Sequence, residues 1–216
     1  MSDSRLIKIG GFCAIAAGVF IILARVFQVA LYGDLPLSIH AADRLFVPLV
    51  GIPGLIGSIF FLLGITGLYA YEAHAAGKFG MITFLLAFIC MSLSLGANWT
   101  YAFGSPYLAS TNAVILDTDF GDLAWGIFGT GFLYSYLLGA LGYLAFCVAT
   151  IFARVLPRWI GFFMLLSMIL AGVLPVGTVG WPSIALNILM GSGPIVFGYH
   201  LIKVREGNPR RTANGE

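Results

Sequence analysis

The sequence predicts an all-α protein, an integral membrane bundle of six transmembrane helices, and three observations support this prediction. Of the 216 residues, 60% are hydrophobic and only 9% are charged, whereas about 25% of the residues in a soluble domain are charged. Apolar segments of roughly membrane-spanning length recur along the chain, and basic residues collect in alternate connections between them. Lipid is therefore the solvent that suits this surface.

The apolar segments define the expected helices, because one helical crossing of a bilayer takes about 20 residues. They cover residues 6–32, 45–71, 79–103, 123–153, 159–174 and 183–202. The last two are short, and proline and glycine in the stretch 175–182 separate them, since both residues break helices. We expect one membrane domain over residues 1–203, followed by a disordered polar tail at 204–216.

The basic residues predict the orientation, because Lys and Arg collect in cytoplasmic connections. One side of the predicted bundle carries Arg5, Lys8, Lys78, Arg154, Arg158, Lys203, Arg205, Arg210 and Arg211. The opposite side carries only Arg44, while Arg25 lies within the first segment. We therefore expect both termini in the cytoplasm and the protein in the plasma (inner) membrane.

Arg25 is the clearest candidate for a functional residue, because an ionisable side chain inside a membrane is costly and marks a functional site by default. It precedes the outer end of its segment by about seven residues, a depth of roughly 10 Å at 1.5 Å per residue. Ala14, Gly18 and Gln28 share its helical stripe. The small residues predict that this stripe faces other helices.

Two further segments place polar side chains at a similar depth, Asn98 and Tyr101 in the third and Asn187 in the sixth. Our hypothesis is a polar pocket in the outer half of the bundle, in which Arg25 binds a carboxylate or phosphate through two hydrogen bonds. The simpler interpretation, which the sequence favours, is that Arg25 extends to lipid phosphate or pairs with an outer aspartate. The two asparagines would then only join helices.

The longest outer connection, 104–122, ends in an acidic stretch. Asp117, Asp119 and Asp122 are the only candidates for a metal site, but they do not match the EF-hand pattern. A solvated turn with Asp122 as the N-cap of the next helix is the preferred interpretation. Residues 106–116 could form a short amphipathic segment on the membrane surface.

Motifs for cofactor binding or catalysis are missing from the sequence. The histidines are too scattered for a haem with two axial ligands, and the three cysteines form no C-x-x-C pair. No phosphate-binding loop, metalloprotease motif or nucleophile elbow is present. Glu72, His74 and Lys78 share an inner connection, for which we expect a solvated loop. Neither a cofactor nor a nucleic-acid partner is predicted.

Two short stretches mark helix ends on the inner side, Gly67-Leu-Tyr-Ala-Tyr71 and Ala153-Arg-Val-Leu-Pro-Arg-Trp159-Ile-Gly161. With these helix ends and its length, the chain resembles a class of small bacterial multi-pass membrane proteins of unknown function. The resemblance implies no activity, cofactor or functional residue.

Three classes of function stay open at this point. Glycine-rich helix faces and the missing catalytic motifs favour a non-catalytic structural or accessory subunit of a membrane complex. The Arg25 pocket would instead indicate a binder or carrier of a lipid or small amphiphilic anion. A membrane enzyme is the third class, and no motif supports it. The expected partners are membrane lipids, together with other membrane subunits or a second copy of the chain.

Overall fold

A computed structural model describes residues 3–33, 35–117, 126–173 and 181–203, and all its regular elements are helical. The tail 204–216, the turn 175–180, Asp119 and Asp122 lie outside these residues. The helices are α1 (Asp3–Tyr32), α2 (Leu37–Ala42), α3 (Ile52–Trp99), α4 (Ser105–Thr111), α5 (Val114–Asp117), α6 (Gly126–Ala153), α7 (Arg158–Val173) and α8 (Trp181–Lys203). Two π-helical turns, η1 (Val47–Gly51) and η2 (Thr100–Gly104), flank α3. The predicted all-α class is confirmed.

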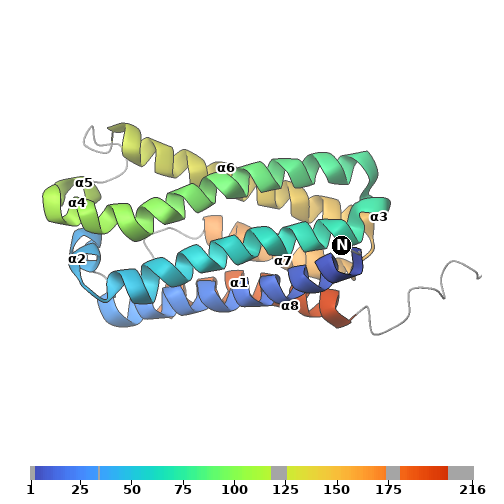
Figure 1. Ribbon diagram of the computed structural model, residues 1–216, viewed down its shortest axis with the longest axis horizontal. Coiled ribbons are helices and arrows are strands. Elements are labelled where there is room, and N and C mark those ends of the chain that lie inside the picture. The colour runs from blue at the N-terminus through green and yellow to red at the C-terminus, as the bar shows by residue number, and fades with distance from the viewer. Residues whose placement is uncertain (1–2, 34, 118–125, 174–180, 204–216) are drawn as a thin grey trace, which may run out of the picture.

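Helix α3 is a hairpin of two antiparallel arms, 52–76 and 78–99, which turns back at Gly77 (Figure 1). Gly77 has φ 56° and ψ −149°, a conformation that is essentially restricted to glycine. The rings of Tyr69 and Phe84 stack across the hairpin with their centroids 4.2 Å apart. This pairing fixes the register of the two arms.

Four helical stretches of the described residues are long and apolar enough to cross a membrane: Arg5–Tyr32, Val47–Thr111, Tyr134–Ala153 and Ile184–Lys203. The second stretch contains both arms of α3. Helix α7 contributes only a shorter apolar stretch, Arg158–Leu170. By length and composition, these four stretches make the chain compatible with a helical membrane protein.

The helices pack closely where glycines meet. A Cβ atom built on Gly10 of α1 would lie 2.5 Å from the Cα atom of Gly67 in the first arm of α3. On α8, Gly198 packs in the same way against the backbone of Gly11. The second arm of α3 packs against α6, where Ser94 Oγ donates a hydrogen bond to the carbonyl oxygen of Ser135 at 2.9 Å. Small residues thus permit the close backbone approach that helix association in lipid requires.

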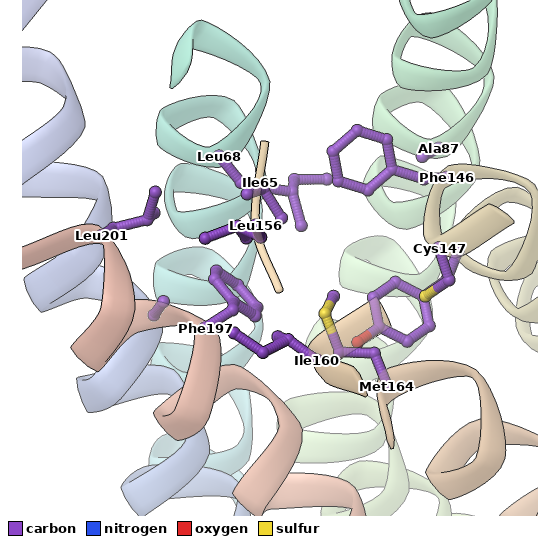
Figure 2. Packing of buried hydrophobic residues seen from close by; sticks show 12 residues of the cluster. Ile65, Leu68, Ala87, Phe146, Cys147, Leu156, Ile160, Met164, Phe197 and Leu201 are labelled. Carbon is purple, nitrogen blue, oxygen red and sulfur yellow. The ribbon is translucent and has the colours of Figure 1, made fainter. Parts of the chain in front are cut away.

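Buried apolar side chains form two clusters at opposite ends of the bundle. The larger one lies toward the end that holds the Gly77 turn and the start of α1, hereafter the Gly77 end (Figure 1). Phe146, Ile160, Met164 and Phe197 point into it from α6, α7 and α8 (Figure 2). The smaller cluster lies at the opposite end, the α2 end, around Phe46. The candidate site lies between these two clusters.

One of the two long connections differs from its expected structure. The inner connection is not a solvated loop throughout, because α3 stays helical up to Gly77 and Glu72 is only 1% exposed. His74 and Lys78 are exposed as expected. The outer connection contains the short helices α4 and α5, in agreement with the segment expected at 106–116.

Candidate functional site

Arg25 lies on α1, two turns before the end of that helix at Tyr32. Its Nη1 atom donates a hydrogen bond of 2.8 Å to Oε1 of Gln28. This pair has the i, i+3 spacing that places side chains on one helical face. Within the residues that the structure describes, no other atom accepts a hydrogen bond from the guanidinium group, and the side chain is exposed. Its remaining N–H groups are available to a ligand.

Gln28 connects Arg25 to the end of the α3 hairpin. Its Nε2 atom donates a hydrogen bond of 3.0 Å to the hydroxyl oxygen of Tyr101 in η2. The Tyr101 ring packs edge-on against Phe46, with the centroids 5.3 Å apart. The apolar cluster at the α2 end therefore holds the tyrosine, and the tyrosine orients Gln28.

Asn98 joins three helical segments one turn away from Tyr101. Its Nδ2 atom donates to Ser58 Oγ in the first arm of α3, and its Oδ1 atom accepts from the hydroxyl group of Tyr136 in α6, each at 3.0 Å. Ser58 in turn donates to the carbonyl oxygen of Gly54 at 2.9 Å. Asn98 is thus held from both sides.

The two hydrogen-bonded chains lie side by side, because Asn98 and Tyr101 are three residues apart in continuous helical turns, at the end of α3 and in η2. We call this group the polar cluster; it comprises Arg25, Gln28, Ser58, Asn98, Tyr101 and Tyr136. Arg25 is its only charged member, and no carboxylate of the described part of the chain forms an ion pair with it. A cation with unused donors beside phenol hydroxyls can bind carboxylate or phosphate oxygens.

The structure brings together four of the five predicted site residues: Arg25, Gln28, Asn98 and Tyr101. The fifth, Asn187, lies half-buried on α8, one turn from Gly191. Gly191 packs against Gly18 and Ile22 of α1. Because α8 runs antiparallel to α1, Asn187 therefore lies one turn nearer the α2 end, at the depth of residues 22–26 of α1 and so of Arg25.

Ser58 and Tyr136 belong to the polar cluster although sequence reasoning did not select them. The sequence marks these two positions only weakly. Ser58 lies among the glycines of the second apolar segment, and Tyr136 directly follows Ser135, which begins a small-residue pair with Gly139.

No group of three or more His, Cys, Asp or Glu side chains that could bind a metal comes together in the described ranges. No known protein family, curated protein or solved structure matches the chain.

Proposed function

We propose that the protein crosses the membrane six times and binds an acidic amphiphile at the polar cluster. The six crossings would be α1, the two arms of α3, α6, α7 and α8. The antiparallel arms of α3 and the antiparallel contact between α1 and α8, seen at Gly11–Gly198 and Gly18–Gly191, support this path. Both termini would then lie on one side of the membrane.

The charge distribution supports an orientation with the Gly77 end in the cytoplasm. Arg5 and Lys8 lie in the first turns of α1, Lys78 follows Gly77, Arg158 begins α7 and Lys203 ends α8. The start of α1, the turn of α3 and the end of α8 lie at that end of the bundle (Figure 1). Basic residues favour the cytoplasmic side. The polar cluster would then lie in the outer half of the plasma (inner) membrane.

The observation that supports binding is the exposed guanidinium group of Arg25, which Gln28 orients and which donates only one hydrogen bond among the described residues. Arg25 lies within Arg5–Tyr32, a helical stretch long and apolar enough to cross a membrane, so a ligand would reach it from the lipid. An acidic head group could accept hydrogen bonds from Arg25 while its hydrocarbon tail stays among the lipid chains. An exposed cation within an apolar stretch therefore favours an amphiphile over a soluble anion.

The structure gives less support than the sequence to a role as an accessory subunit of a membrane complex. The sequence argument relied on glycine-rich helix faces that a partner could approach. Gly10, Gly18 and Gly67 instead pack against other helices of the same chain. These faces are therefore occupied, and they give no support to a partner subunit.

Replacement of Arg25 by glutamine should weaken the binding of an acidic amphiphile to the purified protein. A hydrogen bond to a charged group contributes about 1.5–3 kcal/mol, so Kd should rise roughly 10- to 100-fold. Native mass spectrometry with a long-chain fatty acid, an anionic phospholipid and a zwitterionic phospholipid measures this, and it also separates carboxylate from phosphate ligands.

Arg44→Gln is the matched control, because Arg44 is also exposed, lies toward the α2 end and is not a member of the polar cluster. It should leave Kd within about twofold of the wild type, because a single exposed charge contributes little. Equal losses in the two variants would indicate general charge attraction, and an unchanged Kd in Arg25→Gln would exclude this binding site.

A further inference from the structure

Glu72 is a buried acidic side chain that lies far from the polar cluster. It belongs to the first arm of α3, five residues before Gly77, at the Gly77 end of the bundle. Its side chain is 1% exposed, although a carboxylate is rarely buried in this way unless it is paired. Its burial therefore requires an explanation.

Helix α6 provides the only hydrogen bond to this carboxyl group among the described residues. Thr150, itself 2% exposed, donates from Oγ1 to Oε2 of Glu72 at 3.0 Å. The other oxygen, Oε1, is buried and has no partner in that part of the chain. One oxygen is satisfied and the second is not, which is costly for an ionised carboxylate.

The surroundings of Glu72 contain no described counter-charge. No Lys, Arg or His within the described ranges lies at ion-pair distance from it. The ionisable groups close enough to sense a charge on Glu72 are Tyr71 of its own helix and Cys147 of α6, and Tyr143 lies one turn before Cys147 in the larger apolar cluster. None of these three groups carries a positive charge. Ionisation of Glu72 would therefore leave an unbalanced negative charge in an apolar environment.

We propose that Glu72 and Thr150 form a proton-binding site at the Gly77 end of the bundle, in which the Glu72 carboxyl group is neutral in the folded protein at pH 7. The Thr150 hydroxyl donates to the carbonyl oxygen Oε2, and the proton is carried by Oε1. A proton is the ligand that fits, because one carboxyl group and one hydroxyl group offer too few oxygens for a Ca²⁺ ion, which takes six to eight. This inference is independent of the ligand proposed for the polar cluster.

Infrared difference spectroscopy of the full chain against Glu72→Gln tests the proposal. At pH 7 the wild type should show the carbonyl stretch of a protonated carboxylic acid, which the variant lacks. Raising the pH should convert this band into that of an ionised carboxylate. Asp43→Asn, at an exposed carboxylate of the described residues, is the control and should leave the acid band intact.

Thr150→Val provides a second variant that keeps the carboxyl group and removes its hydrogen-bond donor. The acid band should persist in this variant and shift to higher frequency, because the carbonyl oxygen loses its donor. The proposal is overturned if Glu72→Gln removes the band of an ionised carboxylate at pH 7, or if Thr150→Val leaves the acid band unmoved.

Discussion

Replacement of Gly67 by leucine should lower the free energy of unfolding by about 3 kcal/mol, because overpacking a closely packed contact costs about 1–3 kcal/mol and occasionally more. Even a Cβ atom at Gly67 would lie 2.5 Å from the Cα atom of Gly10, and a backbone atom cannot rotate away. Helix α1 must therefore move away from the first arm of α3. Reversible unfolding of the purified protein in mixed micelles measures the change.

Gly96→Leu is the matched control, because Gly96 lies in the second arm of the same helix and a Cβ atom added there would have no atom within 4 Å. Gly96→Leu replaces glycine by leucine in a helix, as Gly67→Leu does, so the gain in helix propensity is the same and the free energy of unfolding should not fall. The double variant Gly10→Leu, Gly67→Leu should lose less than the sum of the single losses, since either change separates the helices. Equal effects at Gly67 and Gly96, or strict additivity of Gly10 and Gly67, would contradict the close contact.

Alanine at Gly77 should destabilise the protein by about 1–3 kcal/mol through the backbone alone, the usual cost of a strained conformation. With φ 56° and ψ −149°, Gly77 occupies a region that a residue with a Cβ atom avoids. The side chain itself would meet no atom within 4 Å, so steric contact cannot contribute. Reversible unfolding in mixed micelles measures this loss of stability as well.

Gly96→Ala isolates this backbone effect, because it adds the same methyl group in helical conformation and should be neutral or slightly stabilising. If Gly77→Ala proves as stable as Gly96→Ala, the hairpin does not depend on the conformation of Gly77.

The helix positions were largely predictable because they follow from apolar segments and from proline and glycine between them. Helix α1 ends at Tyr32 as predicted, and α7 and α8 begin and end within two residues of the expected bounds. The inner connection of α3 was mispredicted as a solvated loop. Ala73, Ala75 and Ala76 are strong helix formers and continue the helix to Gly77, so Glu72 stays on a helical face and becomes buried.

The candidate site was predictable only where its contacts are local. The pair Arg25–Gln28 follows from i, i+3 spacing on one helix. The bond between Asn98 and Ser58 depends on the exact position of the turn at Gly77, since a shift by one residue would rotate the two side chains apart. Tyr136 reaches Asn98 because α6 packs beside the second arm of α3. Such pairings between distant segments leave no periodic pattern in the sequence.

The proposed location of the polar cluster in the outer half of the membrane depends on six crossings with the Gly77 end in the cytoplasm. Labelling of variants that each carry one added cysteine, with a membrane-impermeant maleimide, tests this orientation. The wild type gives the background from Cys13, Cys90 and Cys147. In intact cells Asn112→Cys, in the exposed turn between α4 and α5, should react. Lys78→Cys and Arg158→Cys should react only after permeabilisation, and reaction of either one in intact cells would contradict the account.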